Sequence, residues 1–337
     1  MRQRVSFFDI GSYRILQQIG GGATSHVHLA RSLDSGETIC VKIVNKSRLE
    51  KPNELELFLR EVSVLSRISH KNIIKYIDFL EDSDRYFLFI EYCNGKSLQS
   101  LIFRSNRISE EHSKRIMKQL LSALDYLHTN GISHRDIKPE NIIVDSEYRL
   151  KLIDFGLTTE NAGNLSTTYC GSPIYAAPEC LSEQPYIPYF ADIWSAGLIL
   201  YVMAVGSLPW KNSNVNHLIK TIISTTVSIP DFVPSGCSSL ISKMLKNNPT
   251  DRQQASKLLQ HSWLGIPNEL VQSNSKPVFF SQNRSNSPRS PIILVKKKPN
   301  PEFPVSPPPQ IKASNPRTII QKHLSNDIQP IKKHITI

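Results

Sequence analysis

The sequence predicts an α+β fold with two lobes, because the pattern of residues changes twice along the chain. Residues 13–93 read mainly as strands with one helix, and residues 94–264 read mainly as helices. We expect the first segment to form a five-stranded antiparallel N-lobe with one main helix, and the second to form a mostly helical C-lobe. After Leu264 the composition changes again, to a basic tail rich in proline and serine.

The strands of the first lobe are predicted by β-branched and alternating residues between turn signals, such as the glycines at 20–22 and the turn at 34–36. A helix is expected over Pro52–Ile68, because apolar residues recur there at helical spacing. The five strands are expected at Tyr13–Gly20, Val27–Arg31, Thr38–Val44, Ile73–Leu80 and Arg85–Glu91.

Three helices are predicted in the second lobe, at Glu110–Asn130, Asp192–Val205 and Cys237–Leu245. The first carries an apolar stripe and ends before Gly131, as a glycine C-cap predicts. The apolar stretch Ile193–Val205 is too short to span a bilayer. We therefore expect a buried core helix there and no transmembrane segment.

Residues 265–337 carry most of the positive charge. They hold 11 Lys or Arg and 3 Asp or Glu, a net charge of +8, which leaves +3 for the preceding 264 residues. We expect this tail to be disordered, because it buries too little apolar surface to offset chain entropy. It lacks interleaved aromatic residues, so no nucleic-acid partner is expected. Its polyproline-like Pro304–Pro309 leaves a tail-binding partner open.

The five cysteines show neither metal-ligand nor disulfide-framework spacing, which favours a reducing, intracellular compartment. The N-terminus has no apolar segment typical of a signal peptide. We expect a cytoplasmic monomer, with the nucleus as an alternative location.

Two features of the first lobe point to phosphate chemistry. Gly20 and Gly22 lie in a G-x-G-x-x-S-x-V stretch that lets backbone N–H groups approach phosphate oxygens, although a plain glycine hairpin fits this pattern equally well. Lys42 follows apolar residues in an expected buried strand, where an unpaired ammonium is costly. An ion pair with Glu61, on the predicted helix, would resolve that cost; a lysine that reaches the surface is the alternative.

The most specific stretch is H-R-D-x-K-x-x-N, formed by His134, Arg135, Asp136, Lys138 and Asn141. An apolar strand then delivers Asp154 in a D-F-G sequence. Phosphoryl transfer needs a metal, cations and an oriented acceptor. Asp136 can accept a hydroxyl proton, Lys138 can offset phosphate charge, and the oxygens of Asn141 and Asp154 can hold Mg²⁺.

Together these motifs resemble the protein kinase superfamily over residues 13–264, about three-quarters of the chain. Ala177, Pro178 and Glu179 match A-P-E. Asp192 opens a D-x-W-S-x-G stretch. The resemblance implies the bilobal protein kinase fold and transfer of the γ-phosphate of ATP, with Mg²⁺ or Mn²⁺, to protein substrates.

The resemblance also assigns roles to individual residues. It implies that Lys42 and Glu61 act with Asp136 and Lys138 in catalysis, and that Asn141 and Asp154 bind the metal. It implies structural roles for Asp192 and for a pair between Glu179 and Arg252. It places the following residues at the ATP site: Ile19, Gly20, Gly22, Val27, Cys40, Lys42, Glu91, Cys93 and Ile143.

The segment 168–179 looks most like the calcium/calmodulin-dependent and AMP-activated protein kinase group, and Lys138 resembles serine/threonine kinases. Arg135 precedes the catalytic aspartate, which implies activation by an upstream kinase through phosphorylation of Thr168, with Thr167 and Ser166 as the alternative sites. Ser97 stands where many relatives have an acidic residue, whereas Glu140 is present. A preference for arginine three residues before the acceptor therefore stays open.

Two other functions fit the sequence less well than an active protein kinase. A pseudokinase scaffold is disfavoured because all the catalytic motifs are present. A small-molecule phosphotransferase is disfavoured by the A-P-E segment, which in relatives belongs to the peptide-binding region.

Overall fold

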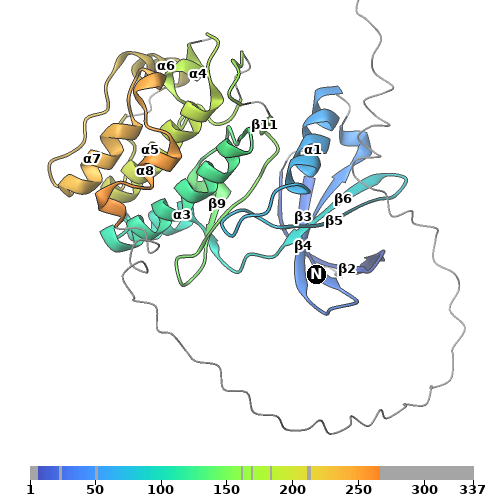
Figure 1. Ribbon diagram of the computed structural model, residues 1–337. Coiled ribbons are helices and arrows are strands. Elements are labelled where there is room, and N and C mark those ends of the chain that lie inside the picture. Colours follow the sequence, from blue (N-terminus) through green and yellow to red (C-terminus); the bar gives the residue numbers. More distant parts are fainter. Residues whose placement is uncertain are drawn as a thin grey trace, which may run out of the picture.

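The computed structural model describes residues 7–22, 25–49, 52–160, 162–167, 170–182, 184–210 and 214–265. The described chain forms two lobes, one built on a sheet and the other mostly helical (Figure 1). This confirms the predicted fold class. Thr168 and the tail predicted over 265–337, apart from Gly265, lie outside the described residues.

The N-lobe is a curved antiparallel sheet in the order β1-β2-β3-β4-β6-β5. Each consecutive pair in this order is antiparallel, and Val27 of β3 lies opposite Lys42 of β4. The strands are β1 Phe8–Ile10, β2 Tyr13–Gly21, β3 Ser25–Ser32, β4 Thr38–Asn45, β5 Tyr76–Glu81 and β6 Arg85–Glu91.

The sheet has six strands where the sequence predicts five. The added strand is β1, which turns at Gly11, with a φ of 55°, and pairs with β2. β5 begins at Tyr76, three residues later than predicted. The reason is that Ile73 and Ile74 bond instead toward Leu152 of the C-lobe.

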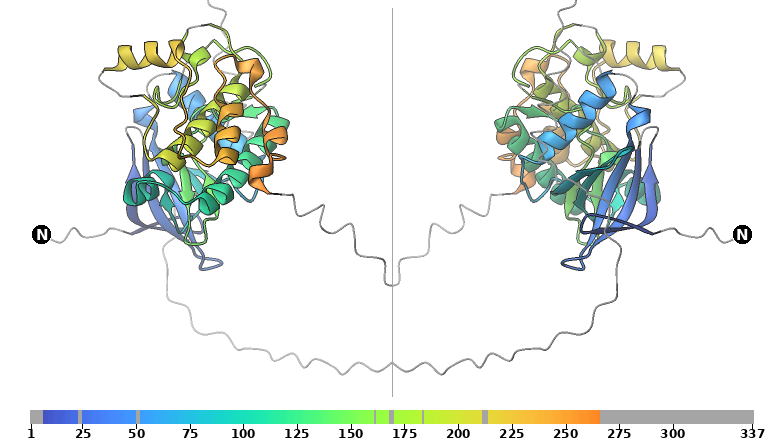
Figure 2. Two further views of the ribbon diagram at one scale, coloured as in Figure 1. Left: turned by 90° about the vertical axis from the view of Figure 1, so that its left-hand side faces the viewer. Right: turned by 90° about the vertical axis from the view of Figure 1, so that its right-hand side faces the viewer.

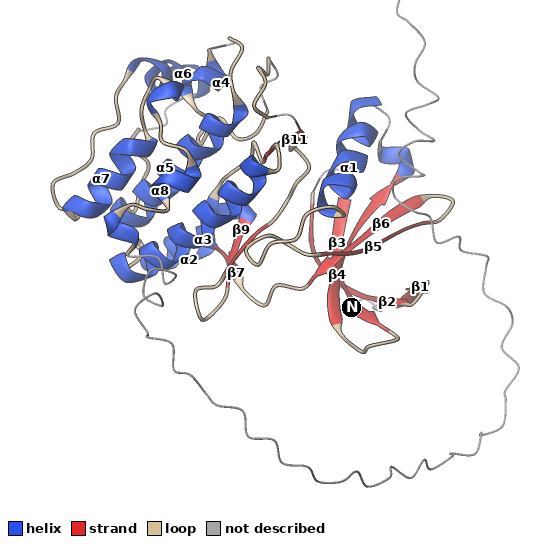
Figure 3. Cartoon of the chain, in the orientation of Figure 1, coloured by secondary structure: helices blue, strands red, loops and turns tan. Residues whose placement is uncertain are grey.

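Helix α1 (Pro52–Leu65) covers one face of the sheet (Figure 3). Its Phe58 ring lies 6.2 Å from Phe79 and 5.6 Å from Tyr86, measured between centroids. The opposite face carries a second, smaller core that includes Ile15, Phe87 and Phe89. Both faces are buried, which explains the near-continuous apolar runs in β4 and β6.

The C-lobe is organised around α3 (Glu110–Thr129) and α5 (Pro188–Val205). Ser109 caps α3 by accepting from the N–H of His112. The helix is followed by Gly131, with a φ of 75°, as predicted. The other helices are α2 Leu98–Ser105, α4 Pro178–Leu181, α6 Val215–Ser224, α7 Ser235–Met244 and α8 Ala255–Leu258. Short 3₁₀ helices are η1 Lys46–Arg48, η2 Pro139–Asn141, η3 Pro249–Asp251 and η4 Ser262–Leu264.

Helix α5 is long and apolar enough to cross a membrane by length and composition alone. However, 78% of that stretch is buried inside the described fold. It is therefore the predicted core helix, packed against α3 and α7 in the middle of the C-lobe (Figure 2).

Short antiparallel pairs position the loops between the lobes. β9 (Ile142–Val144) lies between β7 (Lys96–Ser97) and β10 (Leu150–Leu152). β8 (Ile132–Ser133) pairs with β11 (Thr159–Glu160). The loop between β8 and η2, and the one after β10, therefore emerge beside each other.

Candidate active site

Lys42 and Glu61 form the predicted ion pair between β4 and α1. The Lys42 Nζ atom lies 2.6 Å from Oε2 and 2.9 Å from Oε1 of Glu61, whose side chain is 5% exposed. The same ammonium lies 3.9 Å from the Oδ1 atom of Asp154, whose side chain is 50% exposed. The Lys42 ammonium, from the N-lobe sheet, therefore lies between a buried carboxylate and an accessible one.

The charge of Lys42 is secured by this arrangement. Burial alone lowers the pKa of Lys42, but the carboxylates of Glu61 and Asp154 outweigh that effect and hold the pKa above its ordinary value. The ammonium is therefore present throughout the neutral range. It does not extend freely into solvent, as the alternative reading of the sequence would require.

Asp136 lies at the centre of a second polar group, in the loop after β8. The Lys138 Nζ atom lies 2.7 Å from its Oδ2 atom. The Asn141 side-chain amide donates to the same Oδ2 atom at 2.8 Å and to the Asp136 carbonyl at 2.9 Å. The carbonyl of Asn141 accepts the N–H of Ile153 at 2.9 Å, next to Asp154. This bond ties the two loops together.

Asp192, in the second turn of α5, holds the loop that carries Asp136. The Asp192 carboxylate accepts from the Ser133 hydroxyl at 2.7 Å and from the N–H groups of His134 and Arg135 at 2.9 and 2.8 Å. It also lies 3.0 Å from Nε2 of His128. Burial raises the pKa of Asp192, but these partners outweigh it, so the pKa lies below its ordinary value.

The backbone of these two loops is unusual, because Arg135, before Asp136, and Asp154, after β10, have φ values of 66° and 62°. Residues other than glycine rarely adopt such φ values. The two bonds from Asp192 to the loop explain how the conformation of Arg135 is held.

The predicted ATP-site residues come from several strands of both lobes. Val27, Cys40 and Lys42 lie on β3 and β4, and Ile143 lies on β9. A Cβ added to Gly20 would meet only Val27, at 3.8 Å, and one added to Gly22 would meet no described atom within 4 Å. Packing within the described chain therefore does not require glycine at either position, which leaves room for a close ligand.

The thiols of Cys40 and Cys93, two residues predicted at the ATP site, are protonated. Burial raises the pKa of Cys40 to about 11 and, with the nearby Glu91, that of Cys93 to about 12. The Cys40 side chain therefore offers an uncharged, apolar surface, which suits an aromatic base.

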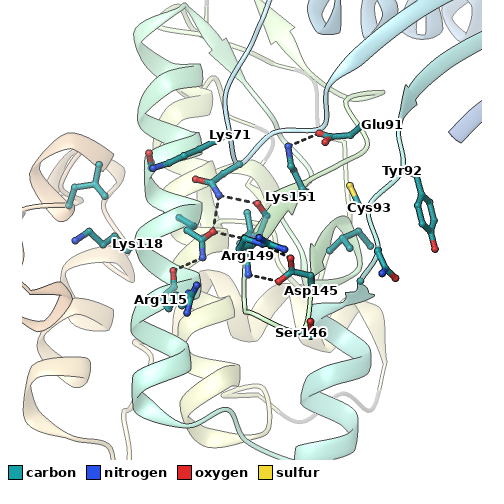
Figure 4. A pocket seen from close by; sticks show the side chains of 18 residues that line it. Lys71, Glu91, Tyr92, Cys93, Arg115, Lys118, Asp145, Ser146, Arg149 and Lys151 are labelled. Atoms are coloured by element: carbon teal, nitrogen blue, oxygen red, sulfur yellow. Dashed lines mark hydrogen bonds and ion pairs between the residues drawn. The ribbon is translucent and has the colours of Figure 1, made fainter. Parts of the chain in front are cut away.

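Glu91 has a side-chain role that the sequence did not indicate. Its carboxylate lies 2.6 Å from Nζ of Lys151 and accepts the N–H of Lys75 at 2.7 Å. This clamps the segment between the lobes, which we call the hinge (residues 91–95), to β10. The side chain is turned to the outer side of the hinge (Figure 4).

Glu179 and Arg252 form the predicted pair, with two parallel bonds of 2.6 and 2.7 Å. The Arg252 side chain is fully buried. It also donates to the carbonyls of Lys246 and Phe190 and lies over the Trp194 ring. The pair therefore joins α4, α5 and η3.

Ser97, where the sequence departs from its relatives, caps α2 by accepting the N–H of Ser100. Glu140 accepts from the Gln99 amide at 2.9 Å. The contact between Gln99 and Glu140 is one that the sequence pattern did not reveal.

The donor set fits a hard divalent cation. Asp154 presents an accessible carboxylate, and Asn141 contributes a carboxamide whose nitrogen is engaged by Asp136. Oxygen ligands of this kind, in small number, suit Mg²⁺ that is shared with phosphate groups and water.

Several functional contacts were missed because nothing in local spacing marks them. His128 and Ser133 bind Asp192 across 64 and 59 residues of sequence. Arg67, at the end of α1, pairs with Glu160 of β11 at 2.7 Å across 93 residues. Only the folded path of the chain brings such residues together.

A family profile described as "Protein kinase domain" matches residues 13–264 of this chain. The carbon catabolite-derepressing protein kinase of Saccharomyces cerevisiae is 36% identical over 280 residues, which cover 82% of this chain and 44% of that protein. The CBL-interacting protein kinase 9 of Oryza sativa is 33% identical over 283 residues, 82% of this chain and 60% of the relative.

The maternal embryonic leucine zipper kinase of Xenopus tropicalis is 36% identical over 255 residues, which cover 75% of this chain and 39% of the relative. The chain thus spans about half the length of the curated relatives it matches. These similarities agree with the group that the sequence suggested.

Proposed function

Because the chain belongs to the protein kinase family, we propose that it transfers the γ-phosphate of ATP to serine or threonine hydroxyls of proteins. One observation carries the proposal, the convergence of three groups from separate elements. Lys42 of β4 lies within 3.9 Å of Asp154, and the backbone next to Asp154 bonds to Asn141, which in turn bonds to Asp136.

Each group has a defined task in this proposal. Lys42, oriented by Glu61, binds ATP phosphates, and Asp136 accepts the proton of the acceptor hydroxyl. Lys138 offsets charge on the transferred group. Asn141 and Asp154 would hold Mg²⁺ or Mn²⁺, which would supply positive charge to offset that of the phosphate oxygens. Val27, Cys40 and Ile143 enclose the adenine ring, Glu91 and Cys93 offer it backbone groups, and Ile19 lies at the same site.

The test is a phosphotransfer assay with a protein substrate mixture, ATP and Mg²⁺. We expect Asp154→Asn and Asp136→Asn each to lower the rate by about 100-fold or more. Asp231→Asn, in an exposed loop far along the chain, is the matched control and should keep the wild-type rate. Equal rates for the wild type and the two site variants would support a pseudokinase scaffold instead.

We also propose that phosphorylation of Thr168 by an upstream kinase activates the enzyme. Support comes from Arg135, which directly precedes Asp136 and whose backbone N–H donates to the buried Asp192 carboxylate. A phosphate can form charge-assisted hydrogen bonds with a guanidinium and order the segment. If Thr168→Ala, purified from its native cell, keeps full activity while Thr167→Ala does not, the site is misassigned.

The proposed catalytic domain spans residues 13–264, and the lobes divide near residue 93. A monomer in the cytoplasm or nucleus is consistent with five free thiols at the described cysteines. Sedimentation and imaging of the tagged chain in its native cell would check both points.

A further inference from the structure

A cavity of about 920 Å³ lies on the outer side of the hinge and has no part in the proposed phosphotransfer. It is bounded by hinge residues 91–95, helix α3 and the hairpin of β9 and β10. Arg115 and Lys118 project from α3 on one side, and Tyr92 and Cys93 lie on the other (Figure 4). Of the predicted ATP-site residues, Glu91, Cys93 and Ile143 line it.

The cavity carries an excess of positive charge. Its lining has the basic residues Lys71, Arg115, Lys118, Arg149 and Lys151, against the acidic residues Glu91 and Asp145. The acidic pair is already neutralised, because Lys151 lies 2.6 Å from Glu91 and Arg149 lies 2.6 Å from Asp145.

The charges of the other three basic residues are not offset by either acidic residue of the lining. Within the described part of the chain, no ion pair involves Lys71, Arg115 or Lys118. Cations grouped without counter-charges raise the local concentration of an anionic partner and speed its association.

Side-chain hydrogen bonds hold together the wall between these cations. The Asn72 side chain donates to Oε1 of Gln119 at 2.9 Å and to the carbonyl of Leu150 at 3.0 Å. Gln119 in turn donates to the carbonyls of Arg115 and Tyr148. The Oδ1 atom of Asn72, which lines the cavity and is 3% exposed as a residue, receives no bond from the described residues.

Apolar groups complete the lining. Tyr92, with 41% of its surface exposed, lies at the hinge end, and Leu259 of the C-lobe lies beyond α3. Ile143 and Leu150 lie between them. The surface therefore offers cations and apolar contacts within one concavity, and this combination suits a polypeptide better than a free phosphate compound.

We propose that this cavity, which we call the hinge-back cavity, binds an acidic and apolar peptide segment of a partner protein. The chain's own tail has the wrong charge, with 11 basic and 3 acidic residues over 265–337. A single-stranded nucleic acid would need a platform of several aromatic rings, and Tyr92 is the only aromatic residue in the described lining.

The test measures binding to the full chain without ATP, so its outcome does not depend on phosphotransfer. The probe is a short fluorescein-labelled peptide in which pairs of glutamates alternate with single leucines. Its binding is measured by fluorescence anisotropy. We expect the triple variant Lys71→Gln, Arg115→Gln, Lys118→Gln to weaken binding about tenfold or more, since each lost cation removes one charge contact. Phosphotransfer to a short peptide should stay at the wild-type rate.

The matched control removes three exposed cations elsewhere, with Lys220→Gln, Lys246→Gln and Lys257→Gln, and should change the affinity less than about twofold. Replacing the glutamates of the probe by glutamine should abolish binding, and replacing the leucines by serine should weaken it.

Three results would overturn the proposal. The first is equal loss of affinity in both triple variants. The second is stronger competition by tripolyphosphate or single-stranded RNA than by unlabelled peptide. The third is a lysine cross-link between Lys118 and the tail in the unmodified chain, which would make the tail the occupant.

Discussion

Lys42 shows at the scale of one residue why a buried charge needs a specified partner. Its ammonium is the cation that faces Glu61, and that carboxylate is almost fully buried. Breaking such a pair from one side leaves the other charge uncompensated, which is more harmful than removing both.

We expect Lys42→Met to lower the free energy of unfolding by about 3 kcal/mol at pH 8. Burial raises the pKa of Glu61 and Lys42 opposes that rise, so the variant should have a higher Glu61 pKa than the wild type. A carboxyl with a raised folded pKa binds more protons when folded, so stability falls as pH rises. The deficit should therefore be small near pH 4 and grow toward pH 8.

Urea unfolding at several pH values checks this prediction. Lys46→Met, which removes a more exposed cation from Glu81, is the control and should show a smaller loss. A deficit for Lys42→Met that stays constant from pH 4 to pH 8 would contradict it, because Glu61 would then not be the group responsible.

At the scale of elements, carboxylates on helices hold distant loops together. Asp192, in the second turn of α5, fixes the loop between β8 and η2, and Glu179, in α4, anchors η3 through Arg252. These contacts let the rigid core helices set the position of loops that have little regular structure of their own.

Asp192→Asn should cost about 2–4 kcal/mol at pH 7, because an amide cannot accept from all of the donors that face the carboxylate. The folded pKa of Asp192 is lowered, so its contribution is present above the unfolded pKa and is lost as pH falls through the folded one. The difference from wild type should therefore narrow below about pH 4. Urea midpoints at pH 7 and pH 3 provide the measurement, and a difference that widens in acid would refute it.

Arg252→Lys should lower stability by about 3 kcal/mol, because a lysine cannot reproduce two parallel bonds to Glu179 in a fully buried position. Arg149→Lys replaces an exposed arginine of a similar two-point pair with Asp145 and Glu147. The control should leave the unfolding midpoint unchanged. Equal effects of the two substitutions would show that burial does not set the strength of the pair.

At the scale of the whole molecule, the hinge sets how the two lobes meet. Gly95 lies so close to β9 that an added Cβ would be 2.6 Å from the Val144 carbonyl oxygen and 2.8 Å from Cγ2 of Ile143. Glu91 and Lys151 hold the other end of the hinge on β10. A change at the hinge should therefore alter how the two lobes are positioned relative to each other.

Gly95→Ala should lower stability by about 1–3 kcal/mol, or roughly 2–4 °C in melting temperature for each kcal/mol, and should raise the KM for ATP. The contacting atoms include backbone, which cannot move aside easily. Gly163→Ala, whose Cβ would meet Tyr189 at an ordinary 3.6 Å, is the control for a simple loss of glycine. An unchanged melting temperature and KM for Gly95→Ala would mean that the hinge yields without consequence.

The sequence by itself determined the local structure and the identity of the reactive groups. Helical spacing located α1 and α3, β-branched runs located β2 to β6, and fixed motifs singled out Lys42, Asp136 and Asp154. These are properties of neighbouring residues, and the side-chain periods of 3.6 and 2 residues convert them directly into buried faces.

Only the tertiary structure decided which distant groups meet. The four partners of the Asp192 carboxylate, the clamp between Glu91 and Lys151, and the unpaired cations of the hinge-back cavity all join segments tens of residues apart. The added strand β1 likewise depends on a sheet that already exists, since a three-residue strand gains its stability from pairing and burial. Local pattern cannot specify such contacts, because they arise from the packing of whole elements around a common core.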